Sequence, residues 1–250
     1  MRNKENWAPS KFRHVNGRMI GSRDTRDVGL GSRLMTDLIA RCYDDHIKQH
    51  ASGKLIDLGC GRVPLYAAYK DYVVDNICVD WENTTHKNDY LDYECDLSRE
   101  LPFGDGEFDT ILFSDVLEHI PDPERVWREM SRILAPNGKL LLNVPFYYWI
   151  HEEPHDYYRY TQYALKRFVE RSGLQLVLIQ PIGGAPEVLA DIMAKNVLRL
   201  PAVGGKLAVF IQWLTRRFID TRFGRAVSES TGQNFPFGYF LVAQKPAAPS

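Results

Sequence analysis

The sequence predicts an α/β fold in which a mostly parallel sheet is flanked by helices. Short apolar segments bounded by glycine or charged residues alternate with longer segments of helical period, from about residue 54 to residue 179. The chain has 250 residues, of which 44% are hydrophobic and 25% are charged, enough for one domain with a large core. Alternation of this kind favours a parallel sheet whose ligand lies at the carboxyl ends of the strands.

The N-terminal third begins with an arm and continues into a β-α-β unit. Residues 1–31 are rich in Arg, Asn, Gly and Ser and show no sustained period of 2 or 3.6, which predicts an N-terminal arm ahead of a domain at 32–250. Apolar residues at helical spacing predict a helix over 32–49. The elements expected next are a strand at 54–58, a helix at about 64–70, a strand at 76–80 and a polar stretch up to Asp92.

The remainder of the chain repeats the alternation and adds an insert. Gly138 and Gly173 stand where helix stops belong. A helical insert at about 186–224 is predicted before the last strand, because two apolar helical stretches follow one another there. The expected elements are strands at 108–113, 139–144, 174–179 and 239–243, and helices at 123–134, 161–172, about 187–200 and about 205–220.

Composition and charge limit the class of partner. A net charge of -1 supplies no broad cationic field, so no nucleic-acid partner is predicted. The four cysteines show no metal-binding spacing and are interpreted as reduced thiols of a cytoplasmic protein. No apolar run approaches the roughly 18 to 20 residues that span a bilayer, so no transmembrane segment is expected.

A glycine turn between the first predicted strand of the sheet and the next helix is the strongest motif. In Asp57-Leu-Gly59-Cys-Gly61, the missing side chains let backbone amides approach a ligand. The alternative is a turn that uses glycine only for a positive φ. A dinucleotide fingerprint requires a third glycine where the chain has Pro64, which disfavours a nicotinamide oxidoreductase.

Further motifs follow the turn in a definite order. Asp80 ends the next strand, Asp96 comes later, and the segment 108–120 reads Phe-Asp-Thr-Ile-Leu-Phe-Ser-Asp-Val-Leu-Glu-His-Ile. Over roughly 55–178 this order resembles the class I S-adenosylmethionine-dependent methyltransferases, particularly their small-molecule branch. The resemblance implies a Rossmann-like sheet, an antiparallel last strand and S-adenosylmethionine as the cofactor.

The resemblance also implies which residues bind the cofactor. The glycine turn with Asp57 would hold its methionine end, Asp80 would accept both ribose hydroxyls, and Asp96 with the Leu97 amide would bind the adenine. The family often has a third glycine where Val63 stands. Trp81 packs on the adenine or is a plain structural aromatic. The predicted cofactor-binding residues are Asp57, Gly59, Gly61, Asp80, Trp81, Asp96, Leu97 and Ser114.

Methyl transfer from a sulfonium to a hydroxyl needs an aligned acceptor and a base that removes its proton. His155 is the favoured base, and His119 is the second candidate catalytic residue. His155 lies in the segment 151–161, His-Glu-Glu-Pro-His-Asp-Tyr-Tyr-Arg-Tyr-Thr, which should overhang the site. Tyr147, Tyr158 and Arg159 are predicted to bind the substrate. The alternative is that this segment anchors a loop to the sheet.

The same segment contains residue types that bind metals. His151, His155 and Asp156 are such residues, but they lie on one short segment without an identified fourth ligand. The sequence therefore predicts no metal site.

The second helix of the insert carries an apolar stripe and several basic residues. The stripe predicts packing on the domain, contact with a second subunit in a homodimer, or peripheral contact with the inner face of an anionic membrane. Its residues are Leu207, Phe210, Ile211, Leu214 and Phe218, and the basic positions of the insert are Lys195, Arg199, Lys206, Arg216, Arg217, Arg222 and Arg225.

Two segments bear on the methyl acceptor. Residues 7–12, Trp-Ala-Pro-Ser-Lys-Phe, and residues 155–161 resemble methyltransferases associated with bacterial surface-polysaccharide biosynthesis. This resemblance implies O-methylation of a sugar or glycan hydroxyl. The alternatives are a quinone-like or lipid-linked acceptor, and a non-catalytic cofactor-binding protein, which the presence of all three acids disfavours. The arm is expected to cover the site or to be frayed.

Overall fold

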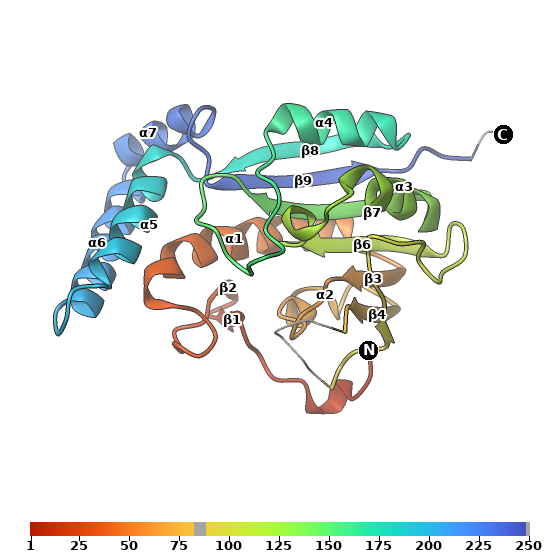
Figure 1. The fold of residues 1–250 in the computed structure, drawn as a ribbon, viewed down its shortest axis with the longest axis horizontal. Coiled ribbons are helices and arrows are strands. Elements are labelled where there is room, and N and C mark those ends of the chain that lie inside the picture. The colour runs from red at the N-terminus through yellow and green to blue at the C-terminus, as the bar shows by residue number, and fades with distance from the viewer. Residues whose placement is uncertain (83–88, 249–250) are drawn as a thin grey trace.

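A seven-stranded sheet forms the centre of the computed structural model, which describes residues 1–82 and 89–248 (Figure 1). Its strand order is β5-β4-β3-β6-β7-β9-β8, and only β9 runs antiparallel to its neighbours. The predicted mostly parallel sheet with an antiparallel last strand is confirmed. The strands are β3 Lys54–Leu58, β4 Asp75–Asp80, β5 Tyr93–Glu94, β6 Phe108–Ser114, β7 Leu134–Pro145, β8 Gln175–Ile182 and β9 Gly238–Gln244.

Helices cover both faces of the sheet because successive strand residues point to opposite sides. Ile56 and Leu142 pack in one apolar cluster with α3 and α4, whereas Leu55 and Leu141 pack in the other with α1 and α5. The helices are α1 Arg33–His50, α2 Tyr66–Tyr69, α3 Pro123–Ile133, α4 Gln162–Arg171, α5 Ala185–Val197, α6 Gly204–Ile219 and α7 Arg222–Gly232, with 3-10 turns at Lys4–Asn6, Leu30–Ser32 and Leu117–His119.

Three elements differ from the sequence prediction. The helix expected over about 64–70 is the single turn α2, and the insert contains a third helix, α7, which Thr221 caps by accepting a hydrogen bond from the Gly224 amide. The short strand β5 directly follows the predicted polar stretch, at positions where no element was predicted. Of the polar stretch predicted between Asp80 and Asp92, residues 83–88 lie outside the described residues.

The N-terminal arm contains a β-hairpin that the periodicity did not predict. Strands β1 Phe12–Val15 and β2 Arg18–Gly21 pair in antiparallel fashion around Asn16 and Gly17, whose φ angles are 52° and 74°. Asn-Gly is the usual pair for such a two-residue turn, so the signal was present in the sequence. Phe12 is 2% exposed, which shows that the arm shares the core of the domain.

The insert lies beyond the end of β8, at the sheet edge where the parallel strands end (Figure 1). In α6, Ala208 and Gln212 are buried against the domain, and Gln212 accepts a hydrogen bond from the Leu34 amide. Most of the predicted apolar stripe faces outward instead, since Phe210 and Leu214 are each 54% exposed. The helices found among the described residues are too short or too polar to cross a bilayer.

A buried amide joins three elements near the carboxyl ends of β6 and β7. The Asn143 Oδ1 atom accepts hydrogen bonds from the Tyr43 hydroxyl at 2.6 Å and the Ser114 hydroxyl at 2.7 Å. Its Nδ2 atom donates to Asp115, whose other carboxylate oxygen lies 2.6 Å from Lys11 of the arm. The strand ends, α1 and the arm are therefore coupled through one side chain.

We expect Asn143→Ala to lower the free energy of unfolding by about 3 kcal/mol, because several polar groups lose partners while remaining largely buried. Tyr43→Phe should cost only about 1 kcal/mol, since Asn143 keeps its other partners. Urea unfolding monitored by circular dichroism measures both values. Equal effects of the two substitutions would show that Asn143 does not couple these elements.

Candidate functional site

The glycine turn after β3 brings backbone amides close to a neighbouring strand end. Gly59 has a φ of 72°, and a Cβ there would lie 2.5 Å from a methyl carbon of Val116, so no larger residue fits without displacement. The Gly61 amide donates to the Asp80 carboxylate at 2.8 Å. Val63, which stands where the family often has glycine, has a φ of 49° and 0% exposure.

Two buried acids lie beneath and beside this turn. Asp57 is 3% exposed, and burial followed by the charge of Asp80 raises its pKa to about 7. Asp80 also accepts a hydrogen bond from the Trp81 amide at 2.8 Å, so its carboxylate links the turn to the end of β4. A cation brought near these acids would favour their ionised forms.

A cavity of about 530 Å³ opens at the carboxyl ends of the parallel strands. Such a volume falls in the usual range for sites that bind cofactors and small molecules. The residues of the glycine turn and the acids form one wall, and histidine and acidic residues form the other. Its lining consists of Gly59, Gly61, Asp80, Trp81, Asp96, Leu97, Ser98, Asp115, Val116, His119, Ile120, Pro121, Glu152, Glu153, Pro154, His155 and Tyr157.

Most of the residues predicted for the cofactor are therefore brought together. Asp96 accepts hydrogen bonds from the Ser98 amide and hydroxyl at 2.9 and 2.6 Å, which holds its carboxylate beside the cavity. Asp57 and Ser114 do not line the cavity. Ser114 instead donates to Asn143 behind the strand ends, a contact that depends on the pairing of β6 with β7 and has no local sequence signal.

The three residues predicted to bind substrate lie outside this cavity. Tyr147 lines a separate depression against α5, and the Tyr158 hydroxyl donates to the Pro121 carbonyl at 3.0 Å. Arg159 makes two hydrogen bonds to Asp156, at 2.5 and 2.8 Å, and one to the Trp149 carbonyl at 3.0 Å. Its planar guanidinium thus braces the loop from inside rather than presenting itself to a ligand.

This braced loop, residues 146–161, supplies the second wall of the cavity. The two ends of the loop are held together because Asp156 accepts hydrogen bonds from Arg159 and from the His151 amide. The His155 imidazole lies edge-on to Trp81, with ring centroids 5.0 Å apart, and its Nδ1 atom is 3.1 Å from the Tyr157 hydroxyl. Both predicted catalytic histidines, His155 and His119, line the cavity.

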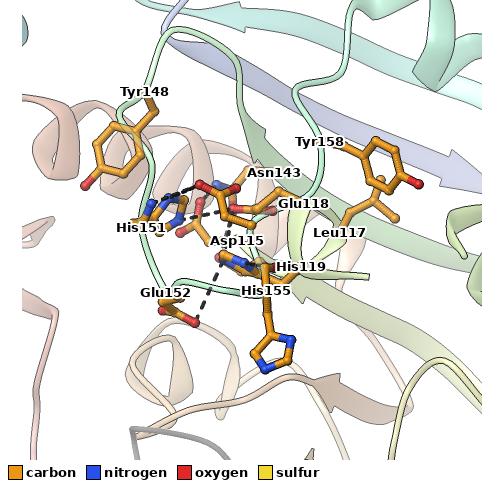
Figure 2. Close-up of polar contacts among 12 residues, drawn as sticks. Asp115, Leu117, Glu118, His119, Asn143, Tyr148, His151, Glu152, His155 and Tyr158 are labelled. Atoms are coloured by element: carbon orange, nitrogen blue, oxygen red, sulfur yellow. Dashed lines mark hydrogen bonds and ion pairs between the residues drawn. The ribbon is translucent and has the colours of Figure 1, made fainter. Parts of the chain in front are cut away.

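Sequence reasoning missed a buried carboxylate behind His119. Glu118 is 0% exposed, and burial with the nearby charge of Asp115 raises its pKa well above the ordinary value. The signal was present, because Glu118 belongs to the motif quoted for the resemblance. Its partner His151 could not be found by spacing, since it lies 33 positions away. Figure 2 shows the imidazoles of His119 and His151 directed toward Glu118 and that of His155 turned away.

The arm contacts the glycine turn and the strand ends, although none of its residues lines the cavity. The Trp7 indole donates to the Val63 carbonyl at 3.0 Å and packs edge-on against Tyr66 at 5.2 Å. Lys11 forms an ion pair with Asp115, a residue that lines the cavity. Both contacts attach the arm directly to the elements that form the cavity.

Comparison with known proteins agrees with this geometry. The model of a family described as a methyltransferase domain matches residues 29–179, more than half of the chain. The chain belongs to this methyltransferase family. Residues 29–179 therefore form a methyltransferase domain, as the motifs predicted.

Two curated relatives show the range of acceptors in this family. A ubiquinone biosynthesis O-methyltransferase of Pseudomonas paraeruginosa is 27% identical over 124 residues, which cover 50% of this chain and 45% of the relative. A 27-O-demethylrifamycin SV methyltransferase of Amycolatopsis mediterranei is 30% identical over 37% of this chain and 38% of the relative. The matched segments thus span less than half of the length of these relatives.

Solved structures share the fold of this chain. A geranyl diphosphate methyltransferase in complex with S-adenosylmethionine has a TM-score of 0.54 and 15% identity, covering 89% of this chain and 93% of its own. The [4+2]-cyclase SpnF has a TM-score of 0.54 and 16% identity, covering 85% of this chain and 83% of its own. At these identities the likeness shows the fold alone.

The raised pKa of Asp57 predicts a stability effect that depends on pH. The folded protein favours the protonated carboxyl, so its stability should fall as pH rises from the ordinary value near 3.8 through about 7. Asp57→Asn removes the buried charge. At pH 8 the variant should melt several degrees above the wild type, whereas at pH 5 the difference in melting temperature should be less than half as large.

Differential scanning calorimetry at both pH values measures this difference, with the exposed Asp71→Asn as the matched control. If the difference in melting temperature between Asp57→Asn and the wild type stays constant from pH 5 to pH 8, the pKa of Asp57 is not raised as assigned.

Proposed function

We propose that the protein transfers the methyl group of S-adenosylmethionine to a hydroxyl of a small acceptor, a sugar or glycan. The observation that carries the proposal is the lining of this cavity, with the glycine turn, Asp80 and Asp96 on one wall and His119 and His155 on the other. A cofactor on the first wall would direct its methyl group toward titratable groups on the second. Such alignment is the main requirement of in-line displacement.

The first wall supports the assignment of cofactor roles. The ionised Asp57 would favour the cationic methionine end, Asp80 would accept the ribose hydroxyls, and the Asp96 carboxylate with the Leu97 amide would bind the adenine. Asp80 would exchange its hydrogen bond from the Gly61 amide for the ribose. Trp81 lies between this wall and His155 and would limit the adenosine pocket.

On the second wall, His155 is the base that the proposal favours. The Tyr157 hydroxyl lies against its Nδ1 atom at 3.1 Å, which leaves Nε2 as the nitrogen to accept a proton from the acceptor hydroxyl. The half-exposed Tyr157, which lines the cavity, provides an aromatic face on which a sugar ring could pack. His119 is the second candidate, because its ring also lines the cavity.

The test measures S-adenosylhomocysteine release by mass spectrometry with S-adenosylmethionine and three acceptor panels: nucleotide sugars with oligosaccharides, quinols, and lipid-linked sugars. Turnover with the first panel is expected. His155→Ala should lower kcat by about 10²- to 10⁴-fold while the KM for S-adenosylmethionine stays within about twofold.

His14→Ala, a substitution of a surface histidine beside Asp44, is the control and should retain full turnover. If kcat falls in His119→Ala and stays at the wild-type value in His155→Ala, His119 and not His155 is the base. Turnover with the quinol panel alone would replace the sugar acceptor by the quinone-like alternative.

An exposed aromatic pair on α6 favours peripheral binding of the protein to a membrane surface. On the outward face of α6, Phe210 and Trp213 stack with ring centroids 5.9 Å apart, and each is 54% exposed. The exposed Lys206 and Arg217 flank this pair on the same helix. An aromatic pair between basic side chains suits the interface of an anionic bilayer, so we place the protein in the cytoplasm, peripheral to the inner face of the membrane.

Sedimentation with vesicles tests this placement. The wild type should bind vesicles that contain phosphatidylglycerol and not those of phosphatidylcholine alone, and Phe210→Ser with Trp213→Ser should weaken binding by at least tenfold. Tyr163→Ser, at a 73% exposed position of α4, is the matched control and should bind as the wild type does. Absence of binding together with a dimer in analytical ultracentrifugation would make α6 a subunit interface.

A further inference from the structure

Behind the second wall of the cavity, two imidazoles face one buried carboxylate. The Glu118 Oε1 atom lies 3.8 Å from Nε2 of His119 and 3.9 Å from Nε2 of His151. Neither Glu118 oxygen has a hydrogen-bond partner among the described residues, and the side chain is 0% exposed. A carboxylate buried in this way is costly unless a cation or a proton compensates it.

The hydrogen bonds of the two histidines determine which ring nitrogens face Glu118. The Nδ1 atom of His119 lies 2.9 Å from the His155 carbonyl, and that of His151 lies 3.3 Å from an Asp156 carboxylate oxygen. Carbonyl and carboxylate oxygens only accept, so each Nδ1 carries the proton in the neutral ring. The lone pairs of both Nε2 atoms therefore converge on the Glu118 carboxylate.

Three converging lone-pair atoms repel one another unless a proton or a cation lies between them, and a metal ion would serve all three at once. A histidine whose second nitrogen donates to a carbonyl or carboxylate is also the usual form of a metal ligand, because that partner orients the ring. The stereochemistry of this cluster thus matches a ligand set with its supporting hydrogen bonds already formed.

We propose that Glu118, His119 and His151 bind a divalent transition-metal ion. Two imidazoles and one carboxylate are typical ligands of zinc, iron and cobalt in proteins. The three ligand atoms lie within 4.8 Å of one another, and ligand distances near 2.1 Å would bring them to separations of about 3.3 Å. The contraction is small, and His151 lies on a loop that can supply it.

The position of the cluster relative to the cavity indicates what the ion would do. His119 lines the cavity, as does Glu152, whose carboxylate lies 3.9 Å from His119 Nε2, whereas Glu118 and His151 lie behind this wall. The remaining coordination positions would then face the acceptor half of the cavity. An acceptor with two neighbouring oxygens would fill them, and its metal-bound hydroxyl would lose a proton more readily. This consequence, unlike the site itself, rests on the proposed function.

The inference replaces the sequence prediction of no metal. That prediction considered His151 with His155 and Asp156 on one segment, but the His155 imidazole points away from the cluster (Figure 2). Asp156 contacts the Nδ1 atom of His151, whereas the Nε2 atom faces Glu118. The ligands come instead from the turn after β6 and from the loop after β7, two segments that only the pairing of these strands brings together.

Metal binding by the full chain is the direct test. Protein treated with a chelator and then dialysed is titrated with Co²⁺ by visible absorption and with Zn²⁺ by calorimetry. One ion per chain is expected, with d–d bands of a low-symmetry cobalt site and a micromolar or tighter Kd. Glu118→Gln and His151→Gln should each weaken binding by at least about 100-fold, and His14→Gln should leave the Kd within about twofold.

Folding and cofactor binding are measured on the same variants. Glu118→Gln keeps the size of the side chain, and His151 is on a loop, so both variants should keep the wild-type circular dichroism spectrum and bind S-adenosylhomocysteine with an unchanged Kd. If Glu118→Gln does not fold, His151→Gln alone decides the test.

Three results would overturn the proposal: no ion bound by the wild type, an unchanged Kd in folded variants, or an intense sulfur-to-cobalt band that places the ion on a cysteine. Stoichiometric metal binding without methyl transfer to any acceptor would refute the proposed function and leave the metal site intact.

Discussion

The parallel pairing of β4, β3, β6 and β7 forces these strands to leave the sheet at one edge. Polar or glycine residues stand at the ends of three of these strands: Gly59 after β3, Asp80 in β4 and Ser114 in β6. The backbone groups beyond the last pairs need partners that the sheet cannot supply. The Asp80 carboxylate serves as such a partner, because it accepts hydrogen bonds from the Gly61 and Trp81 amides. No strand pairing continues beyond these strand ends, so side chains and loops surround the space there and leave the cavity between them.

Several acidic side chains lie close together at the carboxyl ends of the strands, and cationic side chains from distant segments stabilise their negative charges. Lys11 of the arm pairs with Asp115, and Arg159 pairs with Asp156 inside the loop after β7. Glu118 has two imidazoles in place of a basic side chain. Since an uncompensated buried charge is costly, the same electrostatic requirement that attaches the arm and the loop to the sheet also gives Glu118 its proposed cation.

The fold itself does not determine the reaction partner. A methyltransferase of geranyl diphosphate and a [4+2]-cyclase have the same TM-score of 0.54 to this chain. In this chain the loop over 146–161 forms the second wall of the cavity, and the insert exposes Phe210 and Trp213, so side chains that bear on function lie on these segments as well as at the strand ends.

The alternation of strands and helices was enough to predict a mostly parallel sheet with a ligand site at the carboxyl ends of its strands, because both follow from local period and parallel pairing. The antiparallel last strand and the roles of the acids came from the resemblance to a known family. The local period of the sequence could not show that the Arg159 side chain points to Asp156 or that the apolar stripe of α6 faces outward. Both orientations depend on the tertiary contacts that surround each residue. The approach of His151 to Glu118 likewise arises from strand pairing between segments far apart in the chain. Side-chain orientations and long-range contacts were thus determined only by the tertiary structure. The local pattern allows several packing arrangements, and the burial of apolar groups together with the pairing of charges selects one of them.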